Sequence, residues 1–292
     1  MKYLFIINPK SGKQIHRSID RLINFRFSGH DYQICKTEEF SEIKTNCLAA
    51  VEAKLDCVVA IGGDGTISEV ARYLHGSQTA LGIIPAGSGN GYARNLGISL
   101  KPETALNQLT DSQRIKADMG TVNGNLFIGV AGVGYDAHVA ACFNQHGKRG
   151  SWPYFKIALR EYSKYKNFFY RIKTDTETIE TDAFIIAIAK STQFGNGAII
   201  APQAKLNDGF FDLVILKPDS FFRTLWLSRN MFNGTLDTSS YVTYKKVRSL
   251  EIEREGNYQY HLDGELFGTD RTMKIELLNG ALQVMAPRVK SR

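Results

Sequence analysis

Hydrophobic and polar residues follow different spacings in the two halves of the chain. Early on, short apolar runs at residues 3–7, 31–35, 57–61 and 81–84 predict strands. Helical patterns lie between them, at about 15–23, 41–55 and 67–74, and a short helix is expected to stop near Gly97. Strands that alternate with helices are typical of a parallel sheet covered by helices, so this part is predicted to be an α/β domain.

The second half predicts mostly antiparallel strands. Short strand-like runs lie at 184–189, 211–216, 250–255, 258–262, 273–278 and 282–286. Turn signals such as Asn207-Asp208-Gly209 and Asn279-Gly280 separate them, and two helical patterns, 154–165 and 221–232, interrupt them. We therefore expect two domains, 1–120 and 121–281, with the boundary near 116–122.

The composition is that of a globular protein, with 43% hydrophobic and 22% charged residues. The net charge of +7 suits anionic partners, such as phosphorylated ligands or an acidic membrane surface, although an ordinary solvated basic surface explains it equally well. No Lys/Arg block indicates nucleic acid. No apolar run reaches the ~18 residues that span a bilayer, and no signal-peptide pattern is present, so a cytoplasmic protein with peripheral membrane contact is expected.

Three loops that follow predicted strands are rich in glycine and small polar residues. They are N-P-K-S-G-K at 8–13, G-G-D-G-T at 62–66 and P-A-G-S-G-N-G at 85–91. In a parallel sheet, ligands bind beyond the carboxyl ends of the strands. Glycines let backbone N–H groups approach a phosphate, and each following helix directs its positive end there. One such loop is most often a tight turn, but three in succession favour a phosphate site.

Asp64, in the second loop, conflicts with a site for a bare phosphate. Thr66 and Glu69 fit the capping-box pattern S/T-x-x-E, so we expect Thr66 to cap the following helix and Glu69 to return the bond. Asp64 has no part in that pattern. Mg²⁺ resolves the conflict, because it is usually held by one or two carboxylates together with substrate phosphates. Asp64 is therefore predicted to hold Mg²⁺ beside a nucleotide.

The order of the motifs resembles the diacylglycerol kinase catalytic family, which includes bacterial soluble lipid kinases and the sphingosine and ceramide kinases. G-G-D-G-T is followed by P-A-G-S-G-N-G-Y-A-R, then by G-V-G-Y-D-A at 132–137, A-P-Q-A-K-L-N-D-G at 201–209 and D-G-E at 263–265. The resemblance implies an α/β nucleotide domain like that of NAD kinases, a β-sandwich domain for the lipid substrate and an active cleft between them. It also implies that the tail, about 282–292, returns to the first domain.

The same resemblance implies transfer of the γ-phosphate of ATP, with Mg²⁺, to a lipid hydroxyl of a diacylglycerol-like or sphingoid acceptor. Asp64 and Glu265 match catalytic positions, with Glu265 as general base. A structural Mg²⁺ site is implied at Lys205, Asp208 and Phe210, the first and last through backbone carbonyls. The positions that match nucleotide contacts are Asn8, Pro9, Lys10, Ser11, Gly12, Thr37, Gly62, Gly63, Asp64, Gly65, Thr66, Ile67, Ser68, Ser88, Gly89 and Asn90.

Plain structural alternatives exist for several of these positions. Asp263 and Glu265 flank Gly264 on a predicted hairpin turn, where solvated acids are common. Asp208 also belongs to a turn signal, so the sequence is equally compatible with a turn that binds a metal and with a turn that binds none. The stretch 151–166 mixes aromatic and basic residues and fits either a membrane-surface helix or, as we favour, an aromatic core face.

Two other functions stay open at this stage. An NAD kinase shares G-G-D-G-T, although the following P-A-G-S-G-N differs from the glycine motif expected there. A non-catalytic, nucleotide-responsive protein of the membrane surface is motivated by the +7 charge and by Gly91, where the family usually has Asp. The sequence does not fix the oligomeric state, and a homodimer is compatible with it.

Overall fold

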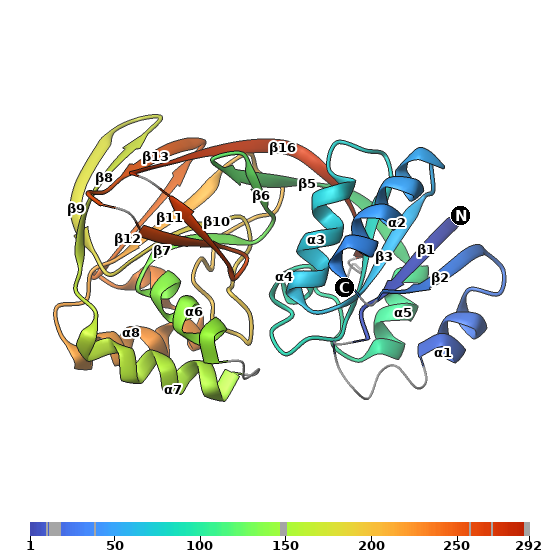
Figure 1. The fold of residues 1–292 in the computed structure, drawn as a ribbon, viewed down its shortest axis with the longest axis horizontal. Coiled ribbons are helices and arrows are strands. Elements are labelled where there is room, and N and C mark those ends of the chain that lie inside the picture. Colours follow the sequence, from blue (N-terminus) through green and yellow to red (C-terminus); the bar gives the residue numbers. More distant parts are fainter. Residues whose placement is uncertain are drawn as a thin grey trace. The chain divides into compact units, whose positions relative to one another are not determined.

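The computed structural model describes residues 1–9, 11, 19–37, 39–146, 151–256, 258–269 and 271–288. The chain forms two compact units, Met1–Ala117 with Asn279–Arg292, and Asp118–Leu278. Elements of the first unit are β1 (Lys2–Ile7), α1 (Ile19–Arg26), β2 (Asp31–Lys36), α2 (Phe40–Glu52), β3 (Cys57–Gly62), α3 (Asp64–Leu74), β4 (Ala80–Pro85), α4 (Gly91–Asn95) and α5 (Pro102–Thr110) (Figure 1).

The first unit is built on a parallel sheet with the strand order β2-β1-β3-β4. The C-terminal part of β16 (Thr272–Pro287) lies beside β4, where Val284 pairs with Leu81 in parallel. Helices α2 and α3 pack together on one face, and α1 and α5 pack on the other (Figure 1). Strands β3 and β4 are buried at every position, as expected for parallel strands covered on both faces.

This strand order creates a switch point between β1 and β3. The chain leaves β1 for β2 on one side and then returns past β1 to form β3 on the other side. At such a point the loops after the two central strands diverge and leave room for a ligand. The loops that begin at Asn8 and Gly63 follow β1 and β3, so the fold brings two of the three glycine loops to this position.

The second unit is mostly antiparallel. One sheet has the order β12-β11-β10-β7-β14-β15, and the other joins β16, β13, β8 and β9. Its elements are β5 (Ser112–Val122, which starts in the first unit), β6 (Asn125–Phe127), β7 (Val130–Gly134), α6 (Tyr135–His146), α7 (Ser151–Glu161), η2 (Tyr162–Lys164), β8 (Phe168–Thr174), β9 (Thr178–Ala183), β10 (Ile185–Ala189), β11 (Phe211–Leu216), α8 (Phe221–Asn233), η3 (Leu236–Thr238), β12 (Val242–Val247), β13 (Ser249–Glu253), β14 (Tyr258–Leu262) and β15 (Glu265–Thr269).

Two apolar clusters organise this unit. The first fills the space between the sheets and contains Tyr170, Phe211 and Tyr260, all almost fully buried. The second lies between the outer face of the six-stranded sheet and the helices, and it includes Ile157 of α7 and Leu227 of α8. The predicted fold class, an α/β domain followed by an antiparallel β domain, is confirmed.

Three sequence expectations are wrong in detail. The predicted turn at Asn279-Gly280 lies inside the single long strand β16, where Gly280 adopts a left-handed φ of 60° that bends the strand without ending it. Helix α3 begins at Asp64, before the expected position. The stretch 151–166 is expected to place Phe155, Leu159 and Tyr162 on one apolar helical face. On α7, Leu159 is instead exposed while Ile157 is buried, and the side chain of Phe155 lies outside the described residues.

Candidate functional site

The loops after β1 and β3 are joined by a hydrogen bond. The side-chain amide of Asn8 donates to the Thr66 hydroxyl at 2.9 Å, and the Asn8 backbone N–H donates to the Ile61 carbonyl at 3.1 Å. Beside them, the buried Thr37 at the end of β2 bonds the Ile7 carbonyl through its N–H at 3.0 Å. These bonds fix the carboxyl edge of the sheet. Pro9 and Ser11 belong to the same loop, and Lys10 and Gly12 lie outside the described residues.

The capping-box expectation for Thr66 and Glu69 is wrong. Gly63 occupies the cap position of α3 and has no side chain to cap with, so Asp64 becomes the first helical residue. The Thr66 hydroxyl is taken by Asn8, and the Glu69 carboxylate accepts from Arg72 at 2.9 Å and Tyr73 at 2.8 Å. The first backbone N–H groups of α3 therefore have no side-chain cap, which suits an anion at this helix end.

Asp64 lies at the start of α3 and is half-buried. Its carboxylate accepts from the backbone N–H of Tyr92 at 3.5 Å, which links the second loop to the third. Ile67 behind it is fully buried in the core, while Ser68 is half-buried on the helix. A carboxylate beside uncapped N–H groups can coordinate a Mg²⁺ ion while the N–H groups bind phosphate oxygens. The residues present thus fit a metal–nucleotide.

Two glycines bring the second and third loops into backbone contact. A Cβ on Gly87 would lie 2.5 Å from the Gly63 Cα, and a Cβ on Gly63 would lie 3.2 Å from the Gly87 Cα. Gly62 is equally constrained, since a Cβ there would lie 2.5 Å from the Thr66 hydroxyl oxygen. Gly65 differs, because a Cβ there would meet nothing within 4 Å. Folding therefore requires glycine at 62 and 87 but leaves the space beside Gly65 open.

The contrast between these glycines predicts opposite phenotypes. Gly87→Ala is expected to destabilise the protein by about 1–3 kcal/mol, because the methyl group overlaps backbone. Gly65→Ala is expected to keep or slightly raise stability, since alanine favours helix by up to about 1 kcal/mol, yet to weaken MgATP binding by filling the open space. Thermal unfolding and calorimetric titration with MgATP measure both effects. Unchanged affinity in Gly65→Ala would show that the nucleotide does not approach there.

The third loop is held by its own asparagine. Asn90 is buried, adopts a left-handed φ of 51° and clamps Gly87 twice, accepting from its N–H at 2.9 Å and donating to its carbonyl at 2.8 Å. Arg94 donates to the Gly89 carbonyl at 3.2 Å. Ser88, at the tip, is exposed. Of the three predicted nucleotide contacts in this loop, Ser88 is thus free to meet a ligand, while the Asn90 side chain shapes the loop.

Glu265 opens β15 in the second unit, directly after a two-residue turn. Leu262 pairs with Glu265 across the hairpin, and Asp263 and Gly264 have φ values of 51° and 88°, as a tight antiparallel turn requires. Asp263 is not a solvated acid. Its carboxylate accepts the backbone N–H groups of Ile128, Gly129 and Val130 at 3.0, 2.8 and 3.0 Å, so it anchors the turn that presents Glu265.

A buried Asp–His pair lies in the same unit and was not predicted. The Asp136 carboxylate and the His261 Nε2 are 3.0 Å apart, and both side chains are almost completely buried. Gly132 on β7 makes room for them, because a Cβ there would lie 2.0 Å from the Asp136 carboxylate. The two residues are 125 positions apart. This separation in sequence explains why no local motif marks the pair.

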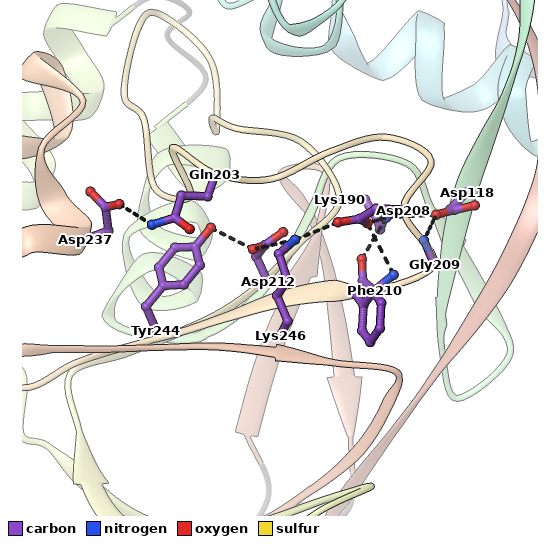
Figure 2. A network of polar contacts seen from close by, with 10 residues as sticks. All are labelled: Asp118, Lys190, Gln203, Asp208, Gly209, Phe210, Asp212, Asp237, Tyr244 and Lys246. Atoms are coloured by element: carbon purple, nitrogen blue, oxygen red, sulfur yellow. Dashed lines mark hydrogen bonds and ion pairs between the residues drawn. The ribbon is translucent and has the colours of Figure 1, made fainter.

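The turn expected to hold a structural Mg²⁺ contains a lysine instead. Figure 2 shows Lys190, at the end of β10, reaching the oxygens of this turn. Its ammonium lies 2.7 Å from the Phe210 carbonyl, 3.2 Å from the Asp208 carboxylate and 3.0 Å from the Asp118 carboxylate. Lys205, the third expected ligand, has an exposed side chain. The residues present do not fit a metal at this turn.

A second lysine, Lys246, forms an ion pair with the other oxygen of the Asp208 carboxylate. Lys246 donates to Asp208 at 2.6 Å and lies 3.4 Å from Asp212, which also accepts from the Tyr244 hydroxyl at 2.7 Å (Figure 2). Burial alone raises the pKa of Asp208, but the hydrogen bonds from Lys246 and Lys190 outweigh it and hold that pKa below its usual value. Asp208 therefore favours the folded state at neutral pH, and this contribution is lost as the pH falls through its lowered folded pKa.

Comparisons with known proteins match both units. The diacylglycerol kinase catalytic domain matches residues 2–122, and the YegS C-terminal NAD kinase beta sandwich-like domain matches 129–286. A "Diacylglycerol kinase" of Mycobacterium tuberculosis is 30% identical, covering 98% of this chain and 96% of the relative. A "Probable lipid kinase YegS-like" of Chromohalobacter salexigens is 28% identical over 97% and 92% of the two chains.

Solved structures agree on the fold. The crystal structure of a diacylglycerol kinase from Bacillus anthracis superposes with a TM-score of 0.76 at 22% identity, covering 98% of this chain and 96% of that one. The matched domains, the relatives that span almost the whole chain and the shared fold lead to the same conclusion. The chain belongs to the diacylglycerol kinase family of lipid kinases.

Proposed function

We propose that the protein transfers the γ-phosphate of MgATP to the hydroxyl of a lipid such as a diacylglycerol or a sphingoid base. The observation that carries the proposal is the edge of the parallel sheet, where an uncapped helix, an open glycine and the Asp64 carboxylate adjoin the switch point. N–H groups of the loops bind phosphate oxygens there, and Asp64 holds the metal. Mg²⁺ supplies charge neutralisation on the phosphates when bound.

Glu265 is the proposed general base for the acceptor hydroxyl. Glu265 begins a strand directly after a turn that three hydrogen bonds to Asp263 anchor, so its backbone has a defined position. Phosphoryl transfer depends chiefly on positioning and on charge neutralisation, so one well-placed general base is sufficient to activate the acceptor hydroxyl.

An acceptor panel tests the proposal. The full-length protein is given γ-labelled ATP and Mg²⁺ with diacylglycerol, sphingosine, ceramide or NAD. Label is expected in a lipid alcohol and absent from NAD. Label in NAD alone would favour the NAD kinase alternative. Nucleotide binding without transfer to any acceptor would favour a non-catalytic protein of the membrane surface.

Access to such an acceptor calls for contact with a bilayer, and we assign this contact to α8. No helix within the described ranges is long and apolar enough to cross a membrane. Helix α8 begins at the Ser220 cap and ends at the left-handed Gly234. Its inner face buries Leu227 and Asn230, while its outer face exposes Phe222, Leu225, Trp226 and Phe232 to between 45% and 80%. An apolar face turned to solvent on a defined helix needs a covering partner.

The basic residues around this apolar face favour an anionic bilayer as its partner. Arg223 and Arg229 share the helix with the aromatic residues, and Lys156, Arg160 and Lys164 are exposed on neighbouring α7 and η2. The two segments touch, because the Tyr162 ring lies 5.1 Å from the Phe221 ring and its hydroxyl 3.2 Å from that of Thr224. Aromatic and basic side chains together on the exposed side of a helix are typical of helices that lie in the membrane interface. The protein is accordingly expected to work in the cytoplasm as a peripheral membrane enzyme.

The double variant Phe222→Ser/Trp226→Ser tests this surface. Its binding to vesicles that contain phosphatidylglycerol should fall by about tenfold or more, since two apolar side chains no longer insert. Phosphorylation of lipid in vesicles should fall in parallel, while phosphorylation of a water-soluble short-chain analogue stays unchanged. Phe25→Ser is the matched control, because Phe25 is 72% exposed on α1 of the other unit. Wild-type dimers that the double variant converts to monomers would identify α8 as a self-interface and contradict the assignment.

A further inference from the structure

Lys190 is the most deeply buried cation among the described residues. Its side chain has a relative exposure of 0%, and Asp118, one of its partners, has 1%. A lysine almost never occupies such a position unless its charge is compensated. Two carboxylates and one carbonyl provide the compensation, and they come from two separate parts of the chain: β5 and the 206–210 turn.

The ammonium of Lys190 has as many acceptors as it has N–H donors. It donates to Phe210 at 2.7 Å, Asp118 at 3.0 Å and Asp208 at 3.2 Å, which accounts for all three protons. The acceptors are themselves fixed. Asp118 also accepts from the Gly209 N–H at 2.9 Å, and Asp208 also accepts from the Phe210 N–H at 3.3 Å. The turn is thus closed around a single positive charge.

These are the oxygens that a divalent ion would use. Mg²⁺ and Ca²⁺ take hard oxygen ligands, carboxylates and backbone carbonyls in particular, and Asp208 and Phe210 are two of the three positions expected to hold the ion. An ion bound to them would lie within a few ångströms of the ammonium, where two cations repel strongly. Lysine and metal therefore exclude each other at this turn.

We infer that the Lys190 ammonium is the resident cation of the Asp118–Asp208–Phe210 cage, so that the wild-type protein binds no divalent metal there. Because the Lys190 ammonium is part of the chain, folding of the second unit does not depend on free Mg²⁺ or Ca²⁺. Removing the ammonium leaves two carboxylates and a carbonyl pointing at one empty position. A variant with a short, neutral residue at 190 therefore becomes a divalent-cation site.

Metal content and melting temperature test the inference without reference to catalysis, in nucleotide-free buffer of constant ionic strength. After dialysis, the wild type should contain well under one equivalent of Mg²⁺ or Ca²⁺, and its melting temperature should not respond to either ion. One bound equivalent that is lost in Asp208→Asn would overturn the inference. This measurement needs no variant at position 190 and stays decisive if such variants fold poorly.

The variants Lys190→Ala and Lys190→Met separate charge from volume. Both should melt about 10 °C lower than the wild type, because two carboxylates lose their buried partner. Saturating Ca²⁺ should restore about 5 °C or more in Lys190→Ala, where space is available, and almost nothing in Lys190→Met, where the side chain fills it. Adding Asp208→Asn to Lys190→Ala should abolish the recovery. Equal recovery in both single variants, or none in a folded Lys190→Ala, would contradict the cage.

Discussion

Glu265→Gln is expected to reduce turnover by about 10²–10⁴-fold while MgATP binds with unchanged affinity. Glutamine has the same shape as glutamate but cannot accept the proton of the acceptor hydroxyl. The turn before it does not depend on the Glu265 charge, because the Asp263 carboxylate and three N–H groups hold it. Turnover with a lipid acceptor and calorimetric binding of MgATP are the two measurements.

Glu255→Gln is the matched control for this prediction. Glu255 is an exposed carboxylate in the same unit, and its replacement should change neither turnover nor stability. Wild-type turnover in a folded Glu265→Gln protein would show that Glu265 is not the general base. An equal loss in both variants would point to a general electrostatic effect of the unit.

Asp64→Asn is expected to cost about 10²–10³-fold in kcat and to raise the Mg²⁺ concentration needed for half-maximal activity. The amide keeps the volume of the side chain but loses the negative charge that holds the ion. Melting temperature should change little, since the carboxylate contact to Tyr92 is long, at 3.5 Å. Steady-state rates over a range of Mg²⁺ concentrations measure the shift.

A control for Asp64 exists in the same unit. Asp111 is an exposed carboxylate, with 68% of its side chain accessible, and Asp111→Asn should leave the Mg²⁺ dependence unchanged. If Asp64→Asn retained the wild-type Mg²⁺ dependence, the second loop would bind the nucleotide without holding its metal. The conflict between a phosphate loop and its own carboxylate would then need another solution.

The apolar runs predicted β1 to β4 of the first unit and β10, β11, β13, β14 and β16, but not β5 to β9, β12 or β15. Predicted strand ends are correct where they coincide with local turn chemistry. The strands Phe211–Leu216 and Tyr258–Leu262 match the predicted ranges at both ends, since Gly209 precedes the first and the Asp263-Gly264 turn follows the second. The turn signal at Asn279-Gly280 failed because a left-handed glycine also serves a bend inside a long strand. Local sequence does not distinguish these two uses.

The site was less predictable wherever partners are far apart in sequence. Thr66 matched a local capping pattern, but Asn8, 58 positions earlier, takes its hydroxyl. Lys190 gave no signal at all, because its carboxylate partners lie 72 positions before it and 18 after it. Only tertiary structure reveals a side chain that occupies the place expected for a metal. Motif order predicted the family, and geometry corrected the roles of single residues.

Mass spectrometry of the lipid product detects the transfer of phosphate from ATP to a lipid hydroxyl. The wild-type protein is incubated with ATP carrying ¹⁸O in its γ-phosphate, Mg²⁺ and diacylglycerol vesicles. We expect a lipid monophosphate that carries the heavy oxygens, formed only with Mg²⁺ and absent with Glu265→Gln. ATP hydrolysis without labelled lipid, for diacylglycerol and for sphingoid bases alike, would contradict this transfer.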